Sequence, residues 1–308
     1  MTPHPAGMRL YDRPYLMLSL TSLFWAGNIV LVRYTAEHIP PIALACVRWA
    51  GACVLVLPFA WPYLRNDWPI LLRRWKLIVV LAALGYAANN ALSLLALQHT
   101  QAINALLIQS SGTLFVALWA LVLYGIRLTW MQALGILLST AGVLTIILRG
   151  DLATLHTISF NLGDILFASA VLCFSAYSAL MQERPAVNPL SLITVMTGVG
   201  ALLLIPPTLV EMSHGRIMRF DTTTVLVSGF TIVFASAIAY VFFNRGIALI
   251  GPNRAAPFFH LVPVFGSVMA ITLLGEQLLP FHLVGYALVL AGIAIASRRP
   301  SSTVTEPS

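Results

Sequence analysis

The segments GILLSTAG at residues 135–142 and GYALVLAG at residues 285–292 share two glycines and an alanine at an offset of 150 residues. The same offset relates the longer blocks 90–148 and 240–298, where Ala105, Phe115, Gly125 and Leu128 recur as Ala255, Phe265, Gly275 and Leu278. If each half crosses a membrane an odd number of times, the second half starts on the opposite side and the two copies are inverted. This arrangement is typical of chains that open one central site to either side of a bilayer.

The composition indicates a membrane protein. Hydrophobic residues make up 59% of the chain and charged residues 9%, whereas soluble domains carry about a quarter charged residues. Apolar stretches of about 20 residues predict ten spans, at roughly 15–33, 41–61, 77–97, 104–124, 130–148, 163–183, 190–210, 225–245, 255–275 and 281–298. We therefore expect an all-α polytopic membrane protein, with ten transmembrane helices in two inverted five-helix repeats (15–148 and 163–298) around a central cavity. The polar tail 299–308 is expected to be disordered.

The basic residues predict the orientation. With the N-terminus inside, one side collects twelve of them, namely Arg9, Arg13, Arg65, Arg73, Arg74, Lys76, Arg127, Arg184, Arg245, Arg254, Arg298 and Arg299. The other side receives Arg33, Arg149, Arg216 and Arg219. This positive-inside bias places both termini, and a loop from Pro62 to Lys76, in the cytoplasm. It also accounts for the net charge of +7 without a nucleic-acid partner.

Polar residues inside the spans predict where the cavity lies, since such groups avoid lipid. Tyr86 and Asn90 share one helical stripe of the third span, and the offset converts them into Ser236 and Tyr240 of the eighth, with Asn244 one turn further. We expect these stripes to bind substrate. The alternative is that they only join helices through hydrogen bonds.

Further candidates extend this site. Gln109 of the fourth span, Trp25 and Asn28 of the first and Tyr177 of the sixth could supply amide and aromatic contacts. His260 could bind substrate or report pH, or it could be a core histidine bonded to a hydroxyl. Pro263 removes a backbone hydrogen bond and predicts a kink.

Arg48 lies within the second span, where an unpaired charge costs at least a few kcal/mol. It could reach an interface, cap carbonyls of a broken helix or hold a substrate carboxylate, and we assign it a gating or structural role. None of the ten acidic residues falls at mid-membrane. A carboxylate proton relay, as used in proton-coupled efflux, is therefore not expected.

Several short motifs resemble those of one transporter superfamily. The second half contains Gly251-Pro-Asn-Arg254, then Leu261-Val-Pro-Val-Phe265 and Leu274-Gly-Glu-Gln-Leu278, and the first half contains Phe24-Trp-Ala-Gly-Asn28. Over about residues 15–298 the chain resembles the EamA-type drug/metabolite transporter superfamily, and within it the YddG-type amino-acid exporters. The resemblance implies ten helices, a cavity lined by spans one, three, four, six, eight and nine, and export of small metabolites. Two departures from the pattern are Tyr124-Gly-Ile-Arg-Leu128, which lacks the glutamate, and Thr113 in place of a proline.

The expected function is export of amino acids and related small, possibly aromatic, metabolites across a bacterial inner membrane by alternating access. We expect a facilitative carrier that works as a monomer in the lipid bilayer, with no catalytic residues, metal or cofactor. The alternatives are proton-driven multidrug or cation efflux, an intramembrane enzyme and a passive channel. No expected span carries the paired aspartates or the His-Glu-x-x-His pattern of an intramembrane enzyme.

Overall fold

A computed structural model describes residues 11–35, 38–100, 105, 108–148, 151, 161–219, 221–274 and 279–297. Every regular element in these ranges is a helix. The first half contains α2 (Pro14–Tyr34), α3 (Pro41–Arg73), α4 (Trp75–Ala82), η1 (Ala83–Ala88), α5 (Asn89–His99), α7 (Gly112–Tyr124) and α8 (Trp130–Ile147). The second half contains α9 (Leu162–Leu180), η3 (Met181–Glu183), α10 (Pro189–Ser213), α11 (Thr222–Phe230), η4 (Thr231–Ile238), α12 (Ala239–Ile250), α13 (Pro252–Ala255), η5 (Ala256–His260), α14 (Leu261–Leu274) and α15 (Pro280–Ala296).

The helices have the length and apolar composition of a polytopic membrane protein. Six are long and apolar enough to cross a bilayer: 14–34, 41–73, 75–99, 162–183, 189–213 and 222–250. Shorter apolar helices cover 108–124, 130–146 and 280–296. The tail 299–308 and the second-half motif from Gly275 to Leu278 lie outside the described residues.

Helix α3 is longer than the sequence predicted. It runs through Pro58, Pro62 and Pro69 for 33 residues, or about 50 Å at the α-helical rise, whereas a bilayer core is about 30 Å thick. The expected loop from Pro62 to Lys76 is therefore wrong as a loop, because only Arg74 separates α3 from α4. A tertiary contact accompanies the extension, since the Asn188 backbone N–H donates to the Asp67 carboxylate at 3.0 Å.

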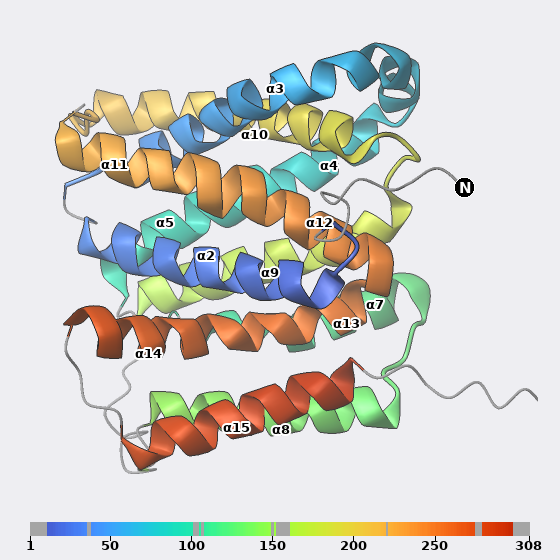
Figure 1. Ribbon diagram of the computed structural model, residues 1–308. Coiled ribbons are helices and arrows are strands. Elements are labelled where there is room, and N and C mark those ends of the chain that lie inside the picture. Colours follow the sequence, from blue (N-terminus) through green and yellow to red (C-terminus); the bar gives the residue numbers. More distant parts are fainter. Residues whose placement is uncertain are drawn as a thin grey trace, which may run out of the picture.

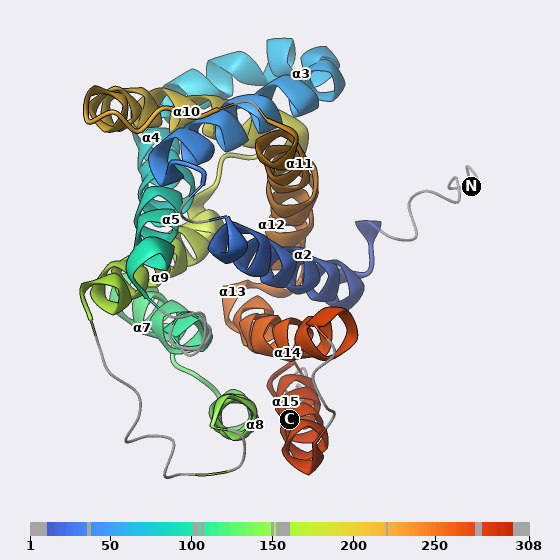
Figure 2. The same cartoon turned by 90° about the vertical axis from the view of Figure 1, so that its left-hand side faces the viewer.

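Two pairs of helices flank the assembly. Figures 1 and 2 show α3 beside α10 at one edge and α8 beside α15 at the other. The α8–α15 pair approaches closely through glycines: a Cβ on Gly142 would lie 2.7 Å from the Gly285 carbonyl oxygen, and one on Gly135 would lie 2.5 Å from that of Gly292. Small residues at such crossings let the backbones of membrane helices meet.

The α3–α10 pair is fastened at both ends by acidic side chains. Glu211, near the end of α10, accepts hydrogen bonds from the Ile42 and Ala43 backbone N–H groups at 3.2 and 2.7 Å. Asp67, near the end of α3, accepts the bond from Asn188 at the start of α10. Each carboxylate satisfies N–H groups that the first turn of a helix leaves without partners.

Three segments depart from α-helical geometry near the centre of the assembly. Both η1 and η4 are π-helical, and η5 is a 3-10 helix. Pro263, where we expected a kink, lies in the first turn of α14, and the 3-10 segment η5 directly precedes it. The residue four positions earlier, Phe259, belongs to η5, so the missing proline N–H falls where the α-helical bonding pattern is interrupted.

Candidate binding cavity

A cavity lies between α2, α3, α5, α9 and α12. The space in which the centre of a water molecule fits is about 70 Å³, enough for several waters. Its polar lining consists of Asn28, Arg48, Asn89, Asn90, Ser93 and Gln109. Its apolar and aromatic lining consists of Trp25, Ile29, Leu94, Leu97, Phe167, Ala170, Val171, Phe174 and Tyr240. No acidic residue of the described ranges lines it.

The two π-helices provide backbone carbonyls for side chains around the cavity. The Gly85 carbonyl of η1 accepts from the Tyr240 hydroxyl at 2.9 Å. The Ala235 carbonyl of η4 accepts from Trp25 Nε1 at 3.2 Å and from Arg48 Nη2 at 2.9 Å. Non-α geometry thus fixes the side chains that surround the site, and π-helices are frequent at functional sites.

Five predicted binding residues line this cavity: Trp25, Asn28, Asn90, Gln109 and Tyr240. The repeat-related pair Asn90 and Tyr240 also touch, with Nδ2 3.5 Å from the hydroxyl. Asn90 further donates to the Tyr86 carbonyl at 2.9 Å. Asn90 and Tyr240 therefore face the cavity and also join two helices, so the two interpretations of the pattern are compatible for this pair.

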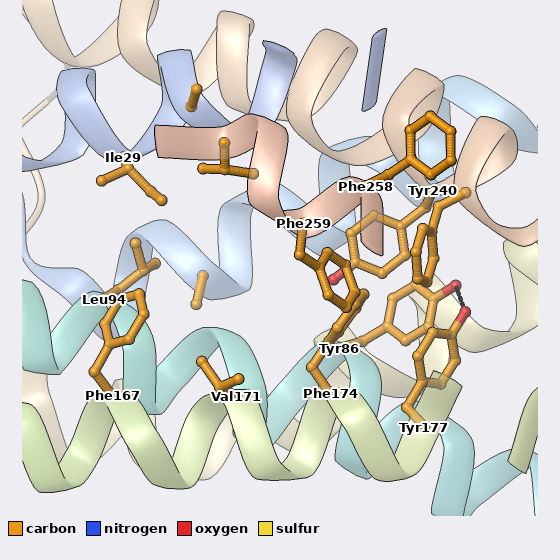
Figure 3. Packing of buried hydrophobic residues seen from close by; sticks show 14 of the residues in the cluster. Ile29, Tyr86, Leu94, Phe167, Val171, Phe174, Tyr177, Tyr240, Phe258 and Phe259 are labelled. Carbon is orange, nitrogen blue, oxygen red and sulfur yellow. Dashed lines mark hydrogen bonds between the residues drawn. The ribbon is translucent and has the colours of Figure 1, made fainter. Parts of the chain in front are cut away.

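Three other predicted binding residues form a layer behind the cavity. Tyr177 donates to Asn244 Oδ1 at 2.6 Å, its hydroxyl lies 3.3 Å from that of Tyr86, and Asn244 Nδ2 is 3.5 Å from the Tyr86 hydroxyl. We call Tyr86, Tyr177, Tyr240 and Asn244 the tyrosine layer. In Figure 3 the tyrosines gather at one end of the aromatic cluster, with Ile29 and Leu94 at the other.

Ser236 and His260 do not line the cavity. Ser236 is fully buried and accepts from Arg48 Nε at 2.6 Å. The His260 ring is also fully buried, with Nδ1 2.5 Å from Ser139 Oγ and Nε2 3.1 Å from Thr113 Oγ1. This is the geometry of a core histidine bonded to hydroxyls.

The sequence placed the sixth span, observed as α9, at the cavity, but Phe167 and Val171 were not predicted to line it. Phe167, Val171 and Phe174 follow one face of this helix in Figure 3 and line the cavity. Their spacing of four and three residues is that of a helical stripe. The stripe could have been found, but an apolar stripe in a membrane helix is equally typical of packing or lipid contact.

Two further hollows lie at opposite ends of the bundle. One, of about 470 Å³, is lined by residues that include Arg33, His99, Arg216 and Arg219, and we call it the basic vestibule. The other, of about 280 Å³, is lined by residues that include Arg184, Asn244 and Arg245. A narrow space of about 10 Å³ lies between the cavity and the basic vestibule, because its lining shares Leu94 with the cavity, and Gln98 and Ile39 with the vestibule.

An ion pair stands beside the basic vestibule. His38 Nε2 lies 2.5 Å from the Asp221 carboxylate, and both side chains are exposed. The Thr224 backbone N–H donates to Asp221 at 2.8 Å. This bond, with the His38 contact, holds the pKa of Asp221 below its ordinary value. Asp221 thus caps α11 and joins it to the segment before α3.

Comparisons with known proteins agree with a transport cavity. The sequence pattern of the EamA-like transporter family matches residues 13–148 and 161–298. A Bacillus subtilis protein named "uncharacterized transporter YyaM" is 28% identical over 92% of this chain and 93% of its own. A Streptantibioticus cattleyicolor protein named "probable terminal-alkyne amino-acid exporter" is 27% identical, covering 92% of each chain. A Salmonella typhimurium protein named "probable amino-acid metabolite efflux pump" is 25% identical over 90% of this chain and 92% of its own.

A solved crystal structure shares the fold. It aligns with a TM-score of 0.75 over 94% of this chain and 99% of that chain, at 16% sequence identity. Similarity at this level of identity concerns the fold alone.

Proposed function

Because the chain belongs to the EamA-like transporter family, and is thus a multi-pass membrane transporter and not an enzyme, we propose that it exports amino acids and related small metabolites. The observation that carries this proposal is the lining of the cavity. Amides and a hydroxyl stand beside aromatic rings and one guanidinium, with no carboxylate from the described residues. Such a lining suits zwitterions with an apolar side chain, since neutral amides can bond both charged groups while the rings pack on the side chain.

Repeat-related contacts support two inverted repeats, 15–148 and 163–298. Residues on an axis of two-fold pseudosymmetry meet their own counterparts, and two pairs do so at the 150-residue offset: Asn90 with Tyr240, and the Ser110 carbonyl with His260 Nε2 at 3.0 Å. The glycine contacts of α8 and α15 are reciprocal in the same way, because Gly135 meets Gly292 while Gly142 meets Gly285. We propose that the ten-helix arrangement places the cavity on this axis.

Alternating access is the mechanism we propose. The narrow space lies between the cavity and the basic vestibule, and we propose that it is part of the outer path. Toward the other end the cavity meets the tyrosine layer, in which Tyr240 lines the cavity and Asn244 lines the opposite hollow. In this state, we propose, the layer closes the inner path. Its hydrogen bonds would exchange for others when the two repeats rock.

The orientation that we propose follows the basic residues. With both termini in the cytoplasm, the basic vestibule faces outward and the exporter is open to the outside of a bacterial inner membrane. We further propose that it works as a monomer within the bilayer.

We propose facilitative transport, with no resident metal or cofactor. A proton-driven exchanger would need a titratable group in the cavity, and His260, the deepest histidine, is bonded away from it. A buried carboxylate facing the cavity would favour the alternative, proton-driven multidrug or cation efflux.

Gln109 provides the test because it lines the cavity and makes no side-chain hydrogen bond with the described residues. We expect Gln109→Leu to lower leucine transport in proteoliposomes by roughly tenfold, the usual loss for one or two bonds to a charged group, and to leave thermal unfolding unchanged. The matched control is Gln132→Leu, which breaks the capping box of α8 and should lower stability but not the transport rate of the folded protein. Normal transport by Gln109→Leu, or none by the parent with any amino acid, would contradict the proposal.

A further inference from the structure

Arg48 is a buried cation that faces the cavity. It lies in the second turn of α3, its exposed fraction is 3%, and its side chain is part of the cavity lining. It does not reach an interface, so the first of the three interpretations offered by the sequence is excluded by its position. The remaining two are a carbonyl cap and a carboxylate receptor.

The partners of Arg48 are all neutral. Its Nε donates to Ser236 Oγ at 2.6 Å and its Nη2 to the Ala235 carbonyl at 2.9 Å, while the guanidinium carbon stands 4.8 Å from the centre of the Trp49 ring. These contacts show that it does cap the π-helix η4. Within the described ranges, however, no carboxylate lies within 4.0 Å of it and Nη1 has no hydrogen-bond acceptor.

A cation in this position is incompletely compensated. Removing a charge from water costs several kcal/mol, which neutral acceptors offset only in part. A carboxylate that enters the cavity would supply the missing negative charge. The planar guanidinium suits it, because two adjacent N–H groups can bond both oxygens of one carboxylate.

The basic vestibule also carries positive charge. Its lining includes Arg33, Arg216 and Arg219. A concentration of positive side chains in a hollow raises the local concentration of anions. Guanidinium groups therefore stand both in this hollow and in the cavity.

We propose that Arg48 is the carboxylate-binding residue of the cavity and that it selects substrates carrying a carboxylate next to a small apolar group. The amides of Asn28 and Gln109 then remain for the rest of the molecule, and Phe167 and Phe174 for its apolar part. This inference rests on the proposed function for the identity of the site, but it concerns binding and can be tested without transport.

The experiment compares three probes with the same carbon skeleton: leucine, leucinamide, which lacks the carboxylate, and 4-methylpentanoate, which lacks the amine. Their binding to purified protein in detergent is measured by isothermal titration calorimetry. The variants are Arg48→Gln, Arg48→Lys and Ser236→Ala, with Arg65→Gln as control because Arg65 lies exposed on the same helix. Thermal unfolding of each variant checks that it is folded.

We expect the parent to bind leucine and 4-methylpentanoate at least about tenfold more tightly than leucinamide, as a bond between charged groups implies. Arg48→Gln should lose this preference for the carboxylate probes over leucinamide, and Arg48→Lys should keep part of it. Ser236→Ala and Arg65→Gln should keep it in full. If Arg48 only caps η4, Arg48→Gln should weaken the binding of all three probes by the same factor. That result, or a parent that binds no carboxylate probe, would overturn the inference, whereas carboxylate binding without any transport would overturn the proposed function alone.

Discussion

At the scale of single residues, position distinguishes two basic residues that look alike in the sequence. Arg48 and His260 both lie deep in apolar segments, and each was open to a structural or a ligand-binding interpretation. The structure places Arg48 in the cavity lining, and His260 among Ser139, Thr113 and the Ser110 carbonyl. The two residues differ because they face different neighbouring helices. Helical spacing within one span does not predict which neighbour a residue faces.

We predict that His260→Ala lowers stability without changing substrate preference. The substitution removes the ring's hydrogen bonds to the Ser139 and Thr113 hydroxyls, each of which keeps a backbone acceptor. The loss of two buried hydrogen bonds costs about 1–3 kcal/mol in total. Thermal unfolding in detergent measures the loss, and His214→Ala, which removes an exposed histidine, is the matched control. A variant that unfolds like the parent but alters pH-dependent uptake would place the ring in the transport path.

At the scale of elements, hydropathy predicted where most spans lie but not their irregularities. The expected span 15–33 is observed as α2 (Pro14–Tyr34), and 190–210 falls within α10 (Pro189–Ser213). The π-helix η1 reads Ala-Leu-Gly-Tyr-Ala-Ala and carries no local signal, because its freed carbonyls are satisfied by Trp49 and Tyr240 from other helices. The extension of α3 to Arg73 was not predicted for the same reason, because the contact that accompanies it, between Asp67 and Asn188, is tertiary.

The close crossing of α8 and α15 gives a prediction for a single methyl group. We expect Gly142→Ala to destabilise the protein by about 1–3 kcal/mol through overpacking, since its Cβ would lie 2.7 Å from the Gly285 carbonyl oxygen. Gly229→Ala is the control, because no atom lies within 4 Å of the added carbon there. Thermal unfolding of both variants measures the loss of stability. An equal loss in Gly142→Ala and Gly229→Ala would mean that α8 and α15 do not cross at this glycine.

At the scale of the whole molecule, the repeat and the basic residues together predict topology. Alkaline phosphatase should be active when fused after Arg149, which the predicted topology assigns to the outside, and inactive when fused after Arg299. Expression in a Gram-negative host and an enzyme assay on intact cells measure this. Activity after Arg299 would contradict both the ten-span count and the inversion of the repeats.

The central claim is that the cavity carries amino acids by alternating access without a proton gradient. Counterflow tests it most directly: proteoliposomes containing purified protein are loaded with unlabelled leucine, and uptake of radiolabelled leucine is followed with and without an imposed pH gradient. We expect internal leucine to accelerate the uptake of labelled leucine, because a loaded carrier returns across the membrane faster than an empty one. We expect the imposed pH gradient to leave the uptake rate unchanged. Uptake at the same rate with and without internal leucine would indicate a channel, and accumulation only under the pH gradient would indicate a proton exchanger. Either result would contradict facilitative transport by alternating access.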